Sequence, residues 1–292
     1  MKTARNAIKL LRQFSREDPE LGVSELARRL DMDRAGVHRL LRALVEERFI
    51  EQNPETRRYR LGFGILDVAA VRMGQTELLD VAPQRMQELR DAVGETVALL
   101  VADGREAVCL AVVESRHTVR VGYDIGERVP LHASAGGLVL LAYLPKSERQ
   151  AIYAAGLRRY TPNTLTDGDA LEARLQQIRA ARAGWSADSY HEGIVSAAAP
   201  IMSPKQNVAG VVTLAGPMQR RGVDDLPRLS EAARRTADAI AADWSAFSVK
   251  GRRLAVGSPG RNDQANDPAG AAAPDGGRCQ TPERSSVGIK RS

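Results

Sequence analysis

The sequence is poor in cysteine: its 292 residues include only two, Cys109 in an apolar run and Cys279 in a polar segment. Two distant cysteines supply neither a disulfide framework nor a cysteine-rich zinc cluster, and a lone buried cysteine usually acts as a small hydrophobic residue. Long apolar runs are lacking too. No segment approaches the roughly 20 apolar residues of a membrane-spanning helix, and the N-terminus has no apolar signal core. We therefore expect a cytoplasmic protein with no membrane partner.

Histidine is also scarce, with four residues: His38, His117, His132 and His191. A metal site of His132, His191 and Asp188 is conceivable, but no HxH or HxxxH spacing supports it. The serines of "HASAGG" and "GIVSA" do not form the GxSxG elbow of a hydrolase. The sequence therefore predicts a protein that is not an enzyme and needs no metal or cofactor.

Positive charge is concentrated at the two ends of the chain. Residues 1–72 hold 15 lysines and arginines against 11 acidic residues, residues 73–248 carry a net charge of −2, and residues 249–292 carry +4. A basic first segment suggests an anionic polymer as its partner. The length suffices for two compact domains.

The first segment has the order of a winged helix-turn-helix domain. "RNAIKLLRQFS" and "GVSELARRLD" have helical periodicity, with Ser24 expected as the N-cap of the second helix. A break at residues 31–33 separates it from a third helix over residues 34–47, and two short strands, Phe49–Gln52 and Arg57–Leu61, follow. A three-residue turn between two helices is what this motif requires, so we expect a DNA-binding domain at residues 1–61.

The third helix has one apolar and one basic face. Val37, Leu40, Leu41 and Leu44 share the inner face. We expect the N-terminal end of the outer face to meet base edges in the major groove, and arginines farther along to meet phosphates. The alternative is a solvated charged face without a partner. The expected base-contacting residues are Arg34, Ala35, Gly36, His38 and Arg39, and the expected phosphate-contacting residues are Arg42, Arg57, Arg58 and Arg60.

The rest of the chain predicts an α+β domain behind a connecting helix at residues 62–76. Residues 77–248 alternate helices with apolar strands, which we expect at Thr96–Ala102, Ala107–Val113, Thr118–Tyr123, Ile194–Met202 and Val208–Ala215. Residues 249–292 are rich in Gly, Pro, Ala and Ser, and we expect a disordered basic tail. Apolar strands that carry Ser134, Ser196 or Thr213 nearby suit a small-molecule pocket, although each hydroxyl can equally be a satisfied core group.

Four stretches in one order resemble the IclR-type bacterial transcriptional regulators, over roughly residues 3–247. They are "LGVSELARRLDMDRAGVHRLLRALVEERFIEQNPETRRYRLG", "VPLHASAGGLVLLA", "AGWSADSYHEGIVSAAAPI" and "VAGVVTLAGP". The resemblance implies that the second domain is a GAF-like effector-binding fold. By motif it assigns the effector to Ser134, Ala135, Gly136, Asp188, Ile194, Ser196, Thr213 and Ala215, with the backbone N–H groups of residues 135–137 suited to a carboxylate.

Two departures bear on the effector. Leu138 stands where the family usually has lysine, and the stretch after "GW" is two residues shorter than usual and ends in Ser189, Tyr190, His191 and Glu192. Tyr190 and His191 are therefore expected to shape specificity, and the effector's identity does not carry over from relatives.

The favoured interpretation is a transcriptional regulator, a repressor or an activator. It binds a double-stranded DNA operator as a homodimer or homotetramer, under control of a small organic acid transmitted through the connecting helix. The alternatives are a GAF-type sensor or enzyme domain with a non-specific basic helical front, and an architectural DNA-binding protein without a ligand. Salt-dependent duplex binding separates the first alternative from the regulator, because phosphate contacts make affinity fall with salt.

Overall fold

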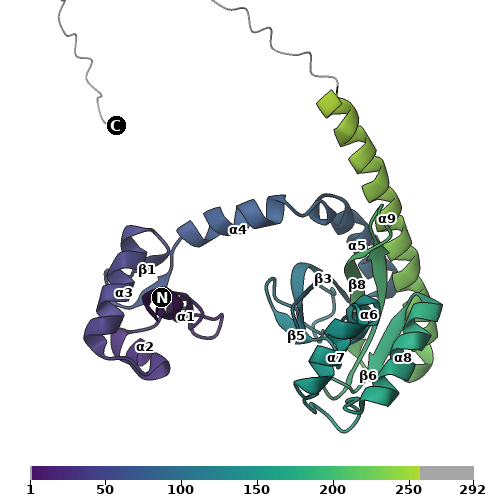
Figure 1. Cartoon of the computed structure of the whole chain (residues 1–292), viewed down its shortest axis with the longest axis horizontal. Helices are drawn as coiled ribbons and strands as arrows, with labels where there is room; N and C mark the ends of the chain where they lie inside the picture. Colours follow the sequence, from purple (N-terminus) through teal and green to yellow (C-terminus); the bar gives the residue numbers. More distant parts are fainter. Residues whose placement is uncertain (1, 257–292) are drawn as a thin grey trace, which may run out of the picture.

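The computed structural model describes residues 2–256, with side chains to residue 247, as an N-terminal helical domain and a larger sheet domain joined by one helix (Figure 1). No helix in these residues is both long and apolar enough to cross a membrane. The rest of the predicted tail lies outside the described residues.

The N-terminal domain has three helices and a two-stranded antiparallel sheet. They are α1 (Lys2–Leu11), α2 (Val23–Leu30), α3 (Arg34–Glu46), β1 (Ile50–Gln52) and β2 (Tyr59–Leu61). Leu10, Leu26 and Leu41 meet in its fully buried core. Asp31 adopts a left-handed conformation (φ 51°) that ends α2 and allows the short turn into α3.

The N-cap of α2 differs from the sequence prediction. The helix begins at Val23 with Gly22 as its N-cap, and Ser24 lies inside the first turn. Leu21 forms a bridge with Tyr59 of β2, with both backbone N–H···O distances at 2.9 Å, so the chain leaves the sheet and enters the helix directly. Tertiary pairing here decides the helix start instead of the local capping preference.

Helix α4 (Gly64–Gly74) connects the two domains, and Figure 1 shows it extending between them. An ion pair between Arg16 Nη1 and Asp124 Oδ1 at 2.7 Å also joins them. Large apolar side chains on and beside α4 are exposed: Phe63 (74%), Leu66 (59%), Val68 (59%) and Val71 (65%). A helix with apolar side chains on several sides normally lies against another element.

The second domain is built on a six-stranded antiparallel sheet in the order β5-β4-β3-β8-β7-β6. Its strands are β3 (Thr96–Asp103), β4 (Glu106–Val113), β5 (Arg128–Pro130), β6 (Gly184–Ala187), β7 (Ile194–Met202) and β8 (Val208–Pro217). Both faces of β7 and β8 are buried, which explains their nearly continuous apolar sequences. The N-terminal helical domain and this sheet domain together make a two-domain α+β fold.

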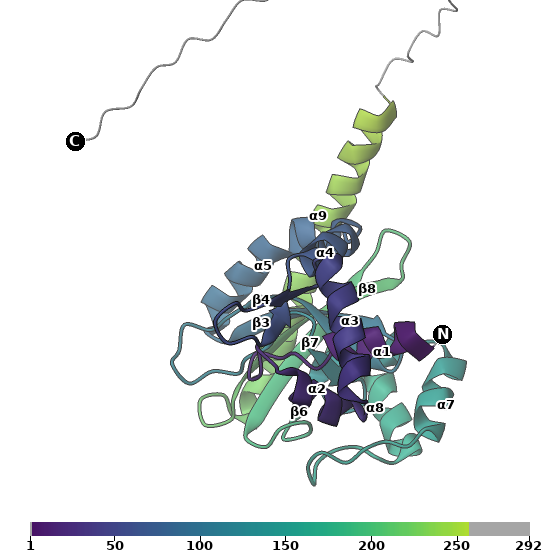
Figure 2. The ribbon, with the colours of Figure 1, turned by 90° about the vertical axis from the view of Figure 1, so that its left-hand side faces the viewer.

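Two layers of helices cover the sheet. One face packs against α5 (Leu78–Val93) and α9 (Leu226–Val256), and the other packs against α6 (Ala135–Tyr143) and α8 (Gly168–Ala181), with α7 (Lys146–Ala154) beyond them. A short 3₁₀ turn, η1 (Val223–Asp225), precedes α9. In the view of Figure 2, α9 continues beyond the sheet domain.

Three local predictions differ from the structure. Residues 118–123, expected as a strand, are irregular, and the chain pairs with β4 only after a turn at Gly126 (φ 86°), where Cys109 N–H donates to Glu127 O at 2.9 Å. The edge strand β6 escaped the sequence analysis because four residues carry too little periodicity. Helix α9 runs to Val256, so residues 249–256 are helical where we expected the disordered tail.

Candidate DNA interface and effector pocket

The start of α3 is fixed by a side-chain cap. Asp33 accepts a hydrogen bond from the N–H of Gly36 at 2.6 Å, which satisfies one of the free donors of the first turn. Gly36 is buried, and a Cβ there would lie 3.1 Å from Asp33 Oδ2 and 3.4 Å from the Met32 side chain. Gly36 was expected to contact DNA, but the space beside its Cα is occupied by the cap, so its small size serves the turn.

The other residues expected at base edges share the free surface of α3. Arg34, Ala35, His38 and Arg39 are exposed, whereas Val37 and Leu41 on the opposite face are fully buried. Among the described residues, neither Arg34 nor Arg39 has a carboxylate within ion-pair distance. Helix α3 lies on the side of its domain that faces away from the sheet domain (Figure 1). This end of α3 therefore offers two unpaired guanidinium groups to an outside partner.

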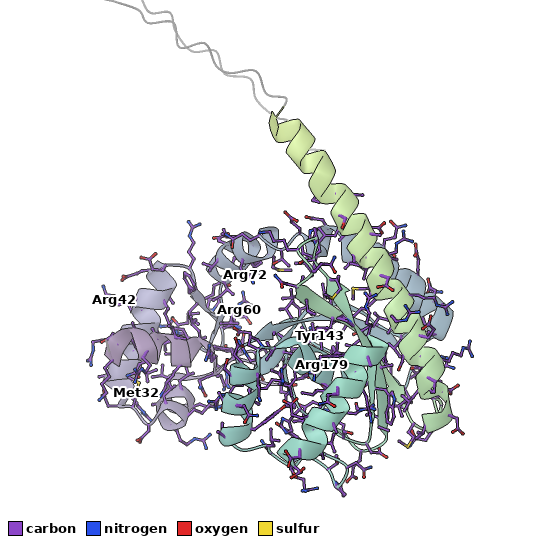
Figure 3. All side chains as sticks on the ribbon, turned by 45° about the vertical axis from the view of Figure 1, so that its right-hand side comes forward. Met32, Arg42, Arg60, Arg72, Tyr143 and Arg179 are labelled. Atoms are coloured by element: carbon purple, nitrogen blue, oxygen red, sulfur yellow. The ribbon has the colours of Figure 1, made fainter. Side chains whose placement is uncertain are left out.

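The arginines expected to contact phosphates differ in their exposure and in their ion pairs within the protein. Arg42 is 84% exposed and pairs with Glu46 at 3.1 Å, and Arg60 pairs with Glu51 at 3.1 Å. Figure 3 shows Arg42 at the outer edge of the domain and Arg60 on the side toward the sheet domain. Both ion pairs are exposed and easily exchanged for phosphate.

Arg57 and Arg58 are neighbours with different environments. Arg57 stands at the turn of the hairpin with a positive φ (59°) and is exposed without an ion pair among the described residues. Arg58 donates to the backbone oxygen of Glu20 at 2.8 Å and to Glu25 Oε2 at 3.2 Å. The Arg58 side chain thus fastens the hairpin to the start of α2, whereas a phosphate contact was predicted for it.

A small cavity, partly open to solvent, lies in the sheet domain, with a volume of about 40 Å³. Its walls come from the irregular segment before β5, from β5, from the N-cap of α6, from β6 and β7, and from the loop between those two strands. The lining residues are Val121, Gly122, Tyr123, Glu127, Val129, Ser134, Ser186, Ser189, Tyr190, His191, Ile194 and Ser196. The lining combines aliphatic side chains with the polar groups of serines, tyrosines, Glu127 and His191, and convergent polar groups beside apolar surface suit a small-molecule site.

Three of the eight residues expected to bind effector line this cavity: Ser134, Ile194 and Ser196. Ser134 is the N-cap of α6 and accepts the N–H of Gly137 at 3.0 Å. Ser196 lies 2.8 Å from Ser186 between their hydroxyl oxygens, so one of the two donates to the other. The N-terminus of α6 and a serine pair therefore supply polar groups at the cavity wall.

The other five expected residues lie outside the cavity lining. Ala135 and Gly136 seat α6 on the sheet, where a Cβ on residue 136 would lie 2.6 Å from Leu100 Cδ1. Thr213 and Ala215 are buried in β8, and Thr213 donates to Ala197 O at 3.2 Å. Asp188 (φ 50°) accepts from Gly193 N–H at 2.5 Å and shapes the loop before β7.

Several lining residues escaped the sequence analysis, and among them Tyr123 and Glu127 carry ionisable groups. Burial raises the pKa of Tyr123, and the Glu127 carboxylate raises it further, so this phenol keeps its proton. Both residues stand in the segment before β5, where the structure has no strand at residues 118–123, and only the closure of the sheet brings them to the cavity.

Tyr190 and His191, for which a role in specificity was predicted, both line the cavity. The ring of Tyr190 lies 4.1 Å from His191 and 4.9 Å from Tyr160, between ring centroids. Thr164 Oγ1 donates to the backbone oxygen of Ser189 at 2.6 Å and holds this loop against the segment before α8. Burial also raises the pKa of Tyr190.

No cluster of three or more His, Cys, Asp and Glu side chains among the described residues could hold a metal ion. His132 Nε2 lies 2.8 Å from the backbone oxygen of Arg158, so that histidine has a structural partner. Cys109 is buried, and burial raises the pKa of its thiol to about 12, which keeps it protonated and unreactive.

Comparison with known protein families accounts for both domains. Residues 3–54 match the IclR helix-turn-helix domain, and residues 71–242 match the C-terminal domain of the bacterial transcriptional regulator IclR. The chain belongs to the IclR family.

Individual relatives of the IclR family agree with this assignment over most of both chains. The transcriptional repressor AllR of Salmonella typhimurium is 31% identical over 236 residues, 80% of this chain and 86% of AllR. The crystal structure of Pseudomonas aeruginosa HmgR has a TM-score of 0.67 at 29% identity and covers 82% of this chain and 98% of its own. An IclR homolog from Microbacterium hydrocarbonoxydans, complexed with 4-hydroxybenzoate, has a TM-score of 0.73 at 25% identity, covering 84% and 99%.

Membership in the IclR family identifies the class of protein. The chain is a transcriptional regulator with a helix-turn-helix DNA-binding domain and a C-terminal effector domain, and its curated relatives are named as regulators, not enzymes. The enzyme alternative is thereby set aside.

Proposed function

We propose that the chain is a one-component regulator that binds a pseudo-palindromic DNA operator in the bacterial cytoplasm, as a repressor or an activator. A small organic acid in the sheet-domain cavity changes its operator affinity. Residues 1–61 bind DNA, residues 62–76 connect, and residues 77–248 bind the effector. Because an effector acts only through its different affinities for two arrangements, the connecting helix must hold the DNA-binding domains differently with and without the acid.

The observation that carries the DNA-binding proposal is the free basic end of α3. Arg34, His38 and Arg39 are exposed there, and the two arginines have no ion-pair partner among the described residues. An unpaired guanidinium at this end of a recognition helix can bind guanine O6 and N7 together. Arg42, Arg57 and Arg60 are proposed to contact phosphates, and Arg58 keeps the hairpin in place for them.

The proposal includes a homodimer, which further association would make a homotetramer. Each chain carries one recognition helix, and helix-turn-helix dimers place two of them about 34 Å apart in successive major grooves. The exposed apolar side chains of α4, led by Leu66 and Val71, support a contact between two copies through this helix. Burying them against a second copy would remove apolar surface from water on both sides.

The acid proposal rests on the polar end of the cavity. Ser134 stands at the N-terminus of α6, whose free backbone N–H groups and helix dipole favour an anion. The relative from Microbacterium hydrocarbonoxydans holds 4-hydroxybenzoate, which is a small organic acid. We therefore place the effector carboxylate beside Ser134, with Ile194 and Ser196 against the rest of the molecule.

A mobility-shift measurement tests the proposal as a whole. The protein is mixed with the DNA upstream of its own gene, over a panel of small aromatic and aliphatic acids, and compared with random duplex at the same salt. A specific shift that one acid weakens or strengthens is expected. Equal binding to random duplex would remove the operator, and a shift that no acid alters would leave a DNA-binding protein without an effector.

Replacement of Arg39 by alanine tests the assignment of α3. Arg39→Ala should weaken operator binding by about 1–3 kcal/mol and reduce the preference over random duplex. The matched control is Arg105→Ala, which removes an exposed arginine from the turn between β3 and β4. Equal effects of the two substitutions on operator preference would exclude a base contact by Arg39.

A further inference from the structure

Glu127 is a carboxylate that lines the proposed effector cavity and is anchored on one side only. Its Oε2 accepts the N–H of Asp124 at 2.9 Å, and its backbone oxygen accepts the N–H of Cys109 at 2.9 Å. Both contacts hold the residue in one position at the turn before β5. Among the described residues, no hydrogen bond is made to Oε1, so half of this half-buried carboxylate lacks a donor.

The charge of Glu127 is also unbalanced within the cavity. None of the cavity-lining residues is an arginine or a lysine, and His191 is the one basic side chain among them. The Glu127 charge is felt by Tyr123 and Tyr190, whose pKa values it raises in addition to burial. A partly buried carboxylate without a cation needs hydrogen-bond donors to offset its lost hydration.

This charge limits what an acidic effector can look like. A ligand carboxylate placed near Glu127 would meet a like charge at low dielectric, whereas one placed at the N-terminus of α6 meets a favourable dipole. The end of the ligand that faces Glu127 must therefore be uncharged or positive. A hydroxyl or amino group there satisfies the open lone pairs of Oε1 with a charge-assisted hydrogen bond.

We propose that Glu127 selects effectors that carry a hydrogen-bond donor opposite their carboxylate, which makes the effector a hydroxy acid or an amino acid and not a plain carboxylic acid. This inference rests on the proposed function, because it assumes that an acid occupies the cavity beside Ser134. It adds to that function the chemical group that the protein recognises on the ligand, a hydrogen-bond donor. It also adds Glu127, a residue that the family resemblance did not assign to the effector.

The size of the cavity sets the choice of probes. A volume of about 40 Å³ is far below the roughly 300 Å³ of a drug-sized site, so small acids fit with the least movement of its walls. We choose two series of different size, each varying only the donor opposite the carboxylate: propanoate, 3-hydroxypropanoate and 3-aminopropanoate, then benzoate, 4-hydroxybenzoate and 4-aminobenzoate. Calorimetric titration of the full-length protein measures each affinity.

The wild-type protein is expected to bind a donor-bearing acid at least tenfold more tightly than the plain acid of the same series. Glu127→Gln keeps an oxygen for the Asp124 N–H but removes the charge. It should reduce this ratio to threefold or less and strengthen binding of the plain acid, because the apolar end of that acid then no longer displaces water from a charged carboxylate. If Glu127 had a purely structural role, its replacement would weaken the binding of all acids together. It would not strengthen the binding of the plain acids.

Two further variants keep the test decisive. Glu192→Gln removes an exposed charge from the neighbouring loop outside the cavity lining and should leave the ratio unchanged. Glu127→Asp keeps the charge but shortens the side chain, so it should lose the preference for donors while still binding plain acids poorly. Unfolding midpoints without ligand identify any variant whose fold is damaged. If Glu127→Gln is such a variant, Glu127→Asp replaces it in the test.

The outcomes separate the two levels of the proposal. Tight binding of plain acids by the wild-type protein, or an unchanged ratio in both Glu127 variants, would overturn the role of Glu127 and leave an acid-controlled regulator. If no acid of either series binds and operator binding is insensitive to all of them, the acid effector itself is contradicted. The hydroxy and amino members of each series show which donor Glu127 prefers.

Discussion

Single residues in the DNA-binding domain divide into those that hold the domain and those left free for DNA, and Arg57 and Arg58 show the contrast best. Arg58 makes two hydrogen bonds to the backbone oxygen of Glu20, at 2.8 and 3.2 Å, and one to Glu25. Arg58→Ala should therefore lower the free energy of unfolding by about 1 kcal/mol, discounted for its partial exposure. Arg57→Ala should leave stability within about 0.5 kcal/mol but reduce the slope of log affinity against log salt by about 1. Chemical denaturation and salt titration of operator binding measure these effects, and a reversed pattern would contradict the division.

Among the elements, α6 is almost completely buried, and its glycines are required by packing. A Cβ on Gly137 would lie 2.4 Å from Pro130 O and 2.7 Å from Leu131 Cα, both backbone atoms that cannot yield cheaply. Gly137→Ala should thus destabilise the protein by about 2 kcal/mol or more and weaken acid binding, because it displaces Ser134 at the cavity. Gly74→Ala at the end of α4 meets no atom within 4 Å and should be neutral or stabilising by up to about 1 kcal/mol. Thermal unfolding with and without acid compares the two, and equal midpoints would show that α6 can shift to accept the methyl group.

For the whole molecule, the exposed apolar surface of α4 predicts association. Val71 on α4 and Ile125 in the sheet domain are exposed to similar extents, 65% and 62%. Val71→Glu should convert the oligomer to monomers and weaken operator binding at least tenfold, because each monomer then reaches one half-site. Ile125→Glu introduces the same charge at a site outside α4 and should change neither property. Sedimentation velocity measures the oligomeric state, and a Val71→Glu protein that remains oligomeric would place the contact elsewhere.

The sequence was most informative where local periodicity coincides with a buried face. The inner face of α3 and the strands β7 and β8 followed from the spacing of apolar residues, since these elements are long and their burial is regular. Ser134, Ile194 and Ser196 lie at the cavity because they stand at the ends or on the faces of such elements. These particular side chains were assigned through the family motifs, because spacing alone left each serine open as a core hydroxyl.

The sequence could not predict how segments distant along the chain come together around the cavity. Glu127 and Tyr123 come from an irregular segment, and their positions depend on pairing between β4 and β5 after the turn at Gly126. Gly36 was expected at DNA from its position in α3, and Gly136 and Asp188 at the effector from family motifs. Their neighbouring atoms show that they also serve the cap of α3, the packing of α6 on the sheet and the loop before β7. A small or turn-forming residue allows the close approach of either a ligand or another backbone segment. The sequence alone therefore cannot show which of the two lies beside it.

The ion pair between Arg16 and Asp124 gives the connection between the domains a particular energetic character. Both side chains are largely exposed, 75% and 47%, and exposed pairs of this kind contribute on the order of 0.5 kcal/mol, a bias of about twofold in a conformational equilibrium. The N–H of Asp124 donates to Glu127 at the cavity wall, so the same short segment touches both the other domain and the proposed ligand site. At this point the two domains are thus joined by a contact weak enough for salt alone to screen. The binding energy of a molecule of a few atoms is enough to break this ion pair.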